Sequence, residues 1–175
     1  MNKLSSQQRR IAKNIIQKCL AVKNKDSVLI LAGPYSLNFA EALAFEAWMQ
    51  GAEPCITYGS DKLALQVYKK VKQKFLKNWP KIADSLSRVV DVRIVLDDSN
   101  PFLASKIPQQ KVEIRRKAVK PITDRIDRKI IQRRMRVALV GFPTPETAKA
   151  LKISFNRLNE IFWNTMDVNH EKLYE

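Results

Sequence analysis

The sequence is poor in the residues that most often build a compact catalytic site. It has one histidine, His170, together with two cysteines and four glycines among 175 residues. A single imidazole falls short of the several carboxylate and imidazole ligands that a hydrolytic metal centre needs. The glycines are dispersed, so there is no glycine-rich phosphate loop, and no Gly-x-Ser-x-Gly segment marks a serine hydrolase. The sequence pattern therefore lends no support to a complete catalytic site in this chain.

Long apolar runs are also absent. No stretch approaches the roughly 20 apolar residues of a membrane span, and the first six residues lack the apolar centre of a signal peptide. Neither Cys19 nor Cys55 has a cysteine or histidine at ligand spacing, so both are predicted to be buried free thiols. The hydrophobic content of 45% indicates a folded globule. We expect one cytoplasmic domain with no membrane association.

What the chain does contain is an alternation of strand-like and helix-like segments. Short apolar runs at 27–32, 55–58, 92–96 and 137–140 predict strands, the first covered on both faces and the last buried. Helical patterns separate them, including one from Lys62 whose buried stripe is expected to include Leu63 and Phe75. The longest pattern follows Pro108, and Pro121 should kink or divide it. This order predicts an α/β fold, a Rossmann-like or flavodoxin-like three-layer domain with a mostly parallel sheet of about four strands.

Ligands of such sheets collect beyond the carboxyl ends of the strands. Segments 33–36, 59–61, 97–100 and 142–144 should share that edge. Ser36 and Thr144 are also expected to cap the helices that follow them. The glycine junction after the first strand could bind an anion on free N–H groups, or could simply start a helix. The residues predicted to form the edge of a substrate cleft are Tyr35, Ser36, Asp97, Asn100 and Thr144.

The net charge of +15 is concentrated in two windows. Residues 62–81 hold 7 basic and no acidic residues, and residues 111–136 hold 11 basic and 3 acidic residues. Basic helical faces can bind phosphate backbones, because this contact releases counterions. They can also be merely solvated or can dock on an acidic partner. Phe75 and Trp79 could stack on bases. The candidate nucleic-acid-binding residues are Arg115, Arg116, Lys120, Arg128, Arg133, Lys74 and Lys77.

The segment Val140-Gly-Phe-Pro-Thr-Pro-Glu-Thr-Ala148, followed by Lys152-Ile-Ser154 and an aromatic-rich helix, resembles the N-terminal domain of the metal-dependent aminopeptidase T and S family. The resemblance extends upstream through segments 15–30, 51–54 and 92–101. It covers most of this chain but only the first half of a family member. Members often have a tryptophan in the strand before the Phe-Pro-Thr turn, and Val137 stands near that place here.

The resemblance implies an enzymatic activity for intact family members, whereas this chain matches only their N-terminal half. Family members remove N-terminal residues from peptides, form homodimers, and use two divalent metals such as zinc or cobalt. Glu, His and Asp residues of a C-terminal domain hold these metals, so we expect no cofactor in this chain. Residues 1–167 would form the N-terminal domain, and residues 168–175 a polar tail or the start of a linker to the missing catalytic domain. Two alternatives stay open: a basic nucleic-acid- or ribosome-binding module, and a noncatalytic partner subunit.

Overall fold

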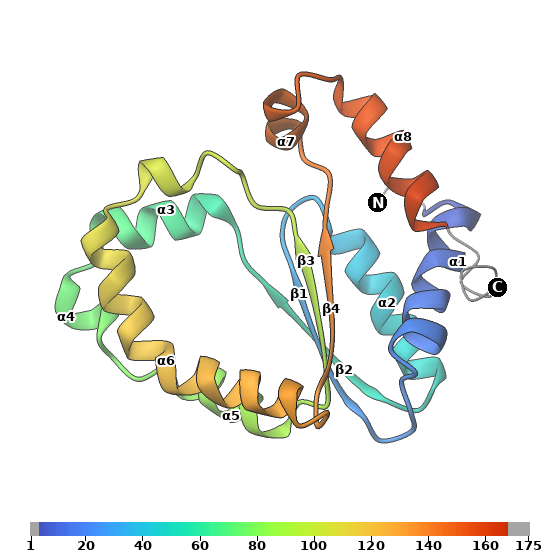
Figure 1. The fold of residues 1–175 in the computed structure, drawn as a ribbon, viewed down its shortest axis with the longest axis horizontal. Helices are drawn as coiled ribbons and strands as arrows, with labels where there is room; N and C mark the ends of the chain where they lie inside the picture. Colours follow the sequence, from blue (N-terminus) through green and yellow to red (C-terminus); the bar gives the residue numbers. More distant parts are fainter. Residues whose placement is uncertain (1–3, 168–175) are drawn as a thin grey trace.

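Residues 4–167 are described by the computed structural model, and they form a parallel sheet between two helical layers. The strands are β1 (Ser27–Ala32), β2 (Glu53–Tyr58), β3 (Val92–Asp97) and β4 (Arg136–Gly141), in the spatial order β2-β1-β3-β4. Every strand pair is parallel. Figure 1 shows the sheet nearly edge-on, with helices on either side. The predicted α/β fold class is confirmed.

The strand order contains a reversal that creates two unlike helical layers. The chain moves from β1 to one edge strand, β2, and then crosses back past β1 to β3 and on to β4. Right-handed crossovers therefore place α2 on one face and α3 to α6 on the other. Figure 1 shows this separation, with α2 to the right of the sheet and α3 to α6 to the left. The reversal between β1 and β3 is the switch point at which open α/β sheets bind ligands.

The first layer holds the hydrophobic core. It comprises α1 (Ser6–Asn14), the π-helical turn η1 (Ile15–Cys19), α2 (Leu37–Met49) and α8 (Phe155–Met166). Phe39 and Leu43 of α2 are buried against the alternate residues of β1 and β3. The aromatic-rich helix α8 joins this core through Trp163, whose ring centroid lies 5.1 Å from that of Phe39 and 5.7 Å from that of Phe142. These edge-on contacts fix α8 to the first face of the sheet.

The second layer is much more open. It comprises α3 (Asp61–Lys70), α4 (Gln73–Leu76), α5 (Lys81–Val89), the short 3-10 turn η2 (Ala104–Lys106) and α6 (Gln109–Ile131). None of the residues of α3 is buried, and Leu63 and Phe75 are 54% and 53% exposed. The predicted buried stripe is therefore wrong, because α3 and α4 stand apart from the sheet, as Figure 1 shows. Helix α6 remains continuous through Pro121, and its ribbon bends partway along its length (Figure 1).

Cations on α6 hold the second layer together. Lys111 donates to the carbonyl of Val71 at the end of α3 (2.7 Å), and Arg115 donates to the carbonyl of Asn78 beyond α4 (3.0 Å). Lys129 donates to the carbonyl of Val90 at the end of α5. The last carbonyls of a helix have no intrahelical partner and carry partial negative charge, so these cations cap three helices from one neighbour. Part of the basic excess is thus structural.

Three further sequence predictions, all about burial, are wrong. Segment 137–140 lies in the edge strand β4, where Leu139 is 72% exposed, and so it is not a buried strand. Strand β1 buries alternate residues only, because its other face meets the open second layer. Cys19 and Cys55 are both exposed instead of buried. Within residues 4–167, none of the helices combines the length and apolar character needed to cross a membrane.

Candidate functional site

A cleft of about 590 Å³ opens at the carboxyl ends of β1, β2 and β3. Its walls come from the turns that follow these strands and from the start of α7 (Pro145–Ala150). Three of the four segments predicted to share the edge contribute to it: 33–36, 59–61 and 97–100. The polar residues that line it are Tyr35, Thr57, Tyr58, Ser60, Asp61, Lys62, Asp97, Asp98, Ser99, Asn100 and Glu146.

The floor of the cleft is organised by the carboxylate of Asp98. Its Oδ2 accepts hydrogen bonds from the backbone N–H of Tyr35 (2.9 Å), the backbone N–H of Ser36 (3.1 Å) and the hydroxyl of Ser36 (3.1 Å). Ser36 is fully buried, and its Oγ in turn accepts from the N–H of Gly33 (2.9 Å). Asp98 thus caps the start of α2 from the end of β3. These N–H groups are occupied by the protein's own carboxylate, so the suggested anion site at this junction is already filled.

Gly33 makes this arrangement possible. A Cβ atom built on Gly33 would lie 2.0 Å from Oδ1 of Asp98, well inside van der Waals contact. The close approach of the β1 turn to the end of β3 therefore requires the absence of a side chain at this position. Ser36 stands at the predicted N-cap position, but its side chain does not cap α2 because it is used in this network.

A second carboxylate ties the neighbouring turns together. Oδ2 of Asp61, the first residue of α3, accepts from the backbone N–H of Asn100 (2.6 Å). The Oδ1 of Asn100 accepts from the N–H of Phe102 (2.8 Å), which closes the turn after β3. Asp97 is exposed, and its Oδ1 accepts from the N–H and the hydroxyl of Ser99. These contacts give the β2–α3 and β3–α6 connections a defined geometry at the mouth of the cleft.

Tyr35 projects into the negative part of the cleft. Its side chain is partly exposed, and partial burial together with the charges of Glu146, Asp98 and Asp61 raises the pKa of Tyr35. The phenol is therefore protonated at neutral pH and can donate a hydrogen bond to a ligand or to a carboxylate. Glu146 belongs to α7, so the cleft brings together residues that are more than 100 positions apart in the sequence.

Thr144 has a structural place beside the cleft. It is fully buried, and its hydroxyl accepts from the N–H of Thr147 (3.0 Å), which makes it the N-cap of α7 as predicted. It does not line the cleft. The preceding residues Phe142 and Pro143 line a separate cavity of about 210 Å³ next to α8, which also contains Tyr35. The fourth predicted edge segment, 142–144, therefore does not line the cleft, whereas Glu146 of the following helix α7 does.

The cleft is acidic although the protein is basic. Four carboxylates, Asp61, Asp97, Asp98 and Glu146, face one ammonium, Lys62. No group of three or more His, Cys, Asp or Glu side chains in residues 4–167 is arranged to hold a metal ion. Asp98 and Asp61 already accept backbone N–H groups, so the donor set does not fit a metal centre. His170 lies outside the described residues. The geometry suits binding of an organic cation better than metal-assisted hydrolysis.

Sequence reasoning identified Tyr35, Asp97 and Asn100 as edge residues but missed Asp61, Asp98 and Glu146. Asp61 and Asp98 lie within the segments assigned to the edge, so their carboxylates were a usable signal. Glu146 follows the first proline of a helix, where a carboxylate is explained by the helix dipole alone.

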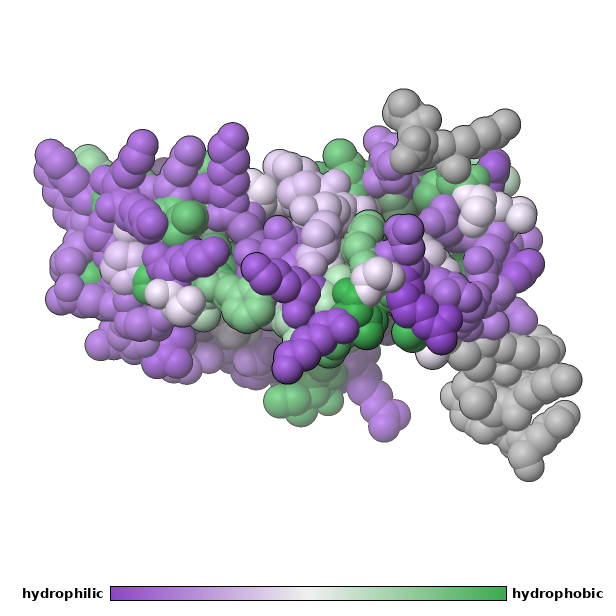
Figure 2. Space-filling model, turned by 90° about the horizontal axis from the view of Figure 1, so that it is seen from above, coloured by the Kyte–Doolittle hydropathy of each residue, from purple (hydrophilic) through white to green (hydrophobic). Residues whose placement is uncertain are grey.

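The predicted nucleic-acid-binding residues do not form one uniform surface. Arg115 caps α4, whereas Arg116 and Lys120 are exposed and pair with Glu113 (2.9 Å) and Asp124 (2.8 Å). The side chain of Arg128 donates to the carbonyl of Asp124, and that of Arg133 is exposed. Lys77 is exposed on the α3–α4 side, and the ammonium of Lys74 lies 5.2 Å from the ring centroid of Phe75. Figure 2 shows hydrophilic side chains covering this end of the molecule.

These features define a class: a parallel α/β domain with a ligand cleft at its switch point and no metal site among residues 4–167. The family model of the thermophilic metalloproteases (M29) matches residues 4–173. The chain belongs to this metal-dependent peptidase family, and the resemblance seen in the sequence is confirmed.

A solved structure of wild-type AmpT from Thermus thermophilus has the same fold as this chain. The TM-score is 0.77 at 20% sequence identity, and the alignment covers 92% of this chain. It covers 42% of the AmpT chain, so this protein spans less than half the length of that relative. A search of curated proteins found no match.

Proposed function

We propose that residues 1–167 are the N-terminal, non-metal-binding domain of a metallo-aminopeptidase that removes N-terminal residues from peptides. The observation that carries the proposal is the family match over residues 4–173, combined with a fold that corresponds to only 42% of the AmpT chain. The two divalent metals of the intact enzyme, zinc or cobalt, would be held by a further catalytic domain. Residues 168–175 would begin the linker to that domain.

In this arrangement the acidic cleft forms one wall of the substrate site. The substrate of an aminopeptidase carries a protonated α-amino group, and Asp61, Asp97 and Glu146 offer it negative charge at the sheet edge. Charges of this kind steer a cationic end toward a site and fix its orientation more than they add affinity. The protonated phenol of Tyr35 supplies a neutral donor beside them. The domain also presents surfaces for a homodimer or for docking with the catalytic domain.

The proposal is tested with the purified chain. We expect no hydrolysis of aminoacyl-anilides with zinc or cobalt present, and no stoichiometric metal after dialysis, measured by elemental analysis. Metal-dependent turnover by a contaminant-free sample would contradict it. A peptide with a free N-terminus should bind the cleft more tightly than its N-acetylated form, and Glu146→Gln should reduce that difference. Equal binding of both peptides would contradict the proposal that the cleft forms part of the substrate site.

A second candidate function is binding of a polyanion, such as RNA or DNA, at the end formed by α3 and α4. The supporting observation is a set of exposed lysines with no ion pair to residues 4–167: Lys69, Lys70, Lys72, Lys74 and Lys77. The exposed rings of Phe75 and Trp79 stand beside them. This surface could equally serve an acidic partner subunit.

Fluorescence anisotropy with labelled RNA and DNA at physiological salt tests this candidate. The double variant Lys74→Glu, Lys77→Glu should weaken binding and reduce its salt dependence. Lys13→Glu, on α1 in the other layer, is the matched control and should have a smaller effect. Negligible affinity of the unmodified chain at that salt concentration would end the candidate.

A further inference from the structure

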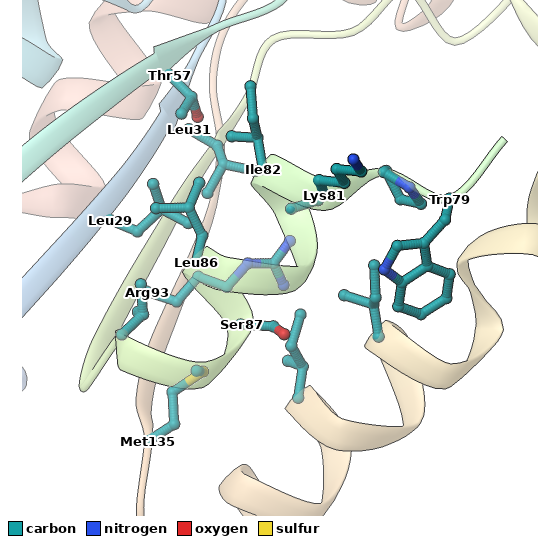
Figure 3. Close-up of a pocket in the computed structure, with 15 residues that line it drawn as sticks. Leu29, Leu31, Thr57, Trp79, Lys81, Ile82, Leu86, Ser87, Arg93 and Met135 are labelled. Atoms are coloured by element: carbon teal, nitrogen blue, oxygen red, sulfur yellow. The ribbon is translucent and has the colours of Figure 1, made fainter.

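A second cavity lies on the opposite face of the sheet from the hydrophobic core. It has a volume of about 730 Å³, is open to solvent on one side, and is lined by residues of β1, β2, β3, α5 and α6. Its walls are apolar, with Leu29 and Leu31 from the sheet, Leu86 from α5 and Ile126 from α6, and Trp79 stands at one side. Figure 3 shows Leu29, Leu31, Ile82 and Leu86 gathered between the sheet and α5. The volume falls within the roughly 300–1,000 Å³ of small-molecule sites.

The cavity exists because the second layer is incompletely packed. Residues that would fill it in a closed layer remain exposed, including Ile82 at 80% and Trp79 at 44%. Only Ser87 of α5 and Ile122 of α6 are buried. Two cations of α6 hold α5 in place: Arg125 donates to the carboxylate of Asp84 in the middle of α5, and Lys129 donates to the carbonyl of Arg88 near its end. The cavity therefore lies between the sheet and two helices whose relative position is held by these hydrogen bonds.

The charged groups that line this cavity are all positive. Arg93 and Lys81 line it, and no carboxylate does. Arg93 lies on β3 between Leu29 of β1 and Val137 of β4, and Figure 3 shows its side chain extending from the sheet toward α5. Its guanidinium makes no hydrogen bond or ion pair with any residue from 4 to 167. Its nitrogen atoms are not sealed from solvent, so the guanidinium is available to an oxyanion that enters the cavity.

We propose that this cavity binds an elongated apolar molecule that ends in one oxyanion, with the head group on Arg93. The apolar walls accept a hydrocarbon body, and the guanidinium fork matches a carboxylate or a phosphate through paired hydrogen bonds. A fatty acid and an alkyl phosphate share this chemistry. The acidic cleft at the carboxyl edge has the opposite charge and rejects the same molecule. The cavity shares Leu31 and Thr57 with the acidic cleft, but the charged residues that line the two differ, and the proposal does not depend on peptide binding in that cleft.

Calorimetry with the intact chain tests the proposal, using decanoate and decyl phosphate as probes below their micelle concentrations. Decanol and decyltrimethylammonium are the matched neutral and cationic probes. We expect both anions to bind the unmodified chain at least tenfold more tightly than either control, and saturation should change the fluorescence of Trp79 but not that of a Trp79→Phe variant. A higher affinity for decanoate or for decyl phosphate identifies the head group. Equal affinity for decanol, or no binding of any probe, overturns the proposal.

The residue assignment is tested with Arg93→Gln and Arg93→Lys. Arg93→Gln should lower the affinity for the anions by roughly tenfold to a hundredfold, since a charge-assisted hydrogen bond is lost, while binding of decanol stays the same. Arg93→Lys should retain part of the affinity. Circular dichroism checks that each variant is folded, and if Arg93→Gln does not fold, the probe selectivity of the unmodified chain still decides the proposal. If sedimentation instead shows that these variants break a dimer and no probe binds, the cavity is a protein interface and the proposal is wrong.

Discussion

The contact between Gly33 and Asp98 makes a specific prediction about two substitutions. A methyl group on Gly33 would lie 2.0 Å from Oδ1, 2.6 Å from Cγ and 2.7 Å from Oδ2 of Asp98. No positive φ restricts Gly33, so alanine is acceptable to the backbone and the clash with the carboxylate is the only obstacle. In Gly33→Ala the carboxylate must move, and the three hydrogen bonds to Oδ2 are lost.

The cost can be estimated from those bonds. Asp98→Ala removes a charged acceptor at the start of α2 and leaves the buried Ser36 hydroxyl with fewer partners, which should lower the free energy of unfolding by about 2–3 kcal/mol. Gly33→Ala in the unmodified chain should cost about 2 kcal/mol for the same reason. In the Asp98→Ala background the methyl group meets no carboxylate. Gly33→Ala should then be neutral or stabilising by about 0.5 kcal/mol, because it reduces the entropy of the unfolded chain.

Urea unfolding of the four proteins in this double-mutant cycle, followed by circular dichroism, measures the coupling. We expect a coupling energy of about 2 kcal/mol. Gly59→Ala is the matched control, because a Cβ atom there meets nothing within 4 Å, and it should change stability by less than about 0.5 kcal/mol. Additive costs of the two substitutions, or a harmless Gly33→Ala, would refute the assignment of Asp98 as the cap of α2.

Three more predictions follow from the second layer and the exposed thiols. Arg115→Met should lower the free energy of unfolding by about 1 kcal/mol because it uncaps α4, whereas Arg116→Met should change it little, as thermal or urea unfolding will show. The hydrogen bond from Arg125, and then the pairing with Arg88, lower the pKa of Asp84. This stabilisation is present above the ordinary aspartate value of about 3.9 and is lost as the pH falls through the lower folded value, so Arg125→Met should flatten the acid limb of a stability–pH curve. Cys19 and Cys55 should both react with a thiol reagent without denaturant, and protection of both until unfolding would contradict their exposure.

The local features of this protein could be predicted because each depends on a few neighbouring residues. Thr144 was predicted to cap a helix from its place before a proline, and the structure gives it the capping hydrogen bond; Ser5 and Ser154 cap α1 and α8 in the same way. Gly51 ends α2 with a φ of 75°, as a glycine after a helix usually does. Short apolar runs typical of strands alternate with segments of helical periodicity, and this alternation indicated a parallel sheet.

Burial was predicted less well, because it depends on what lies opposite each segment. The apolar residues of α3 and β4 have the spacing of buried elements, but α3 stands away from the sheet and β4 is an edge strand. The roles of the basic residues of α6 could not be predicted from the sequence either. Arg115 and Arg116 are neighbours with the same charge, yet one caps a helix and the other is paired on the surface.

The sequence by itself determined the family, the fold class and the four turns expected at the sheet edge, since these follow from periodicity, turn residues and a recognisable segment around Phe142. Only the tertiary structure decided that Asp98 closes the start of α2, that Glu146 joins the acidic cleft, and that Arg93 lines the apolar cavity beside α5. Spacing along the chain fixes which residues share an element. How deeply a side chain is buried, and which charged groups it meets, depend on how the crossover connections place the elements against the sheet.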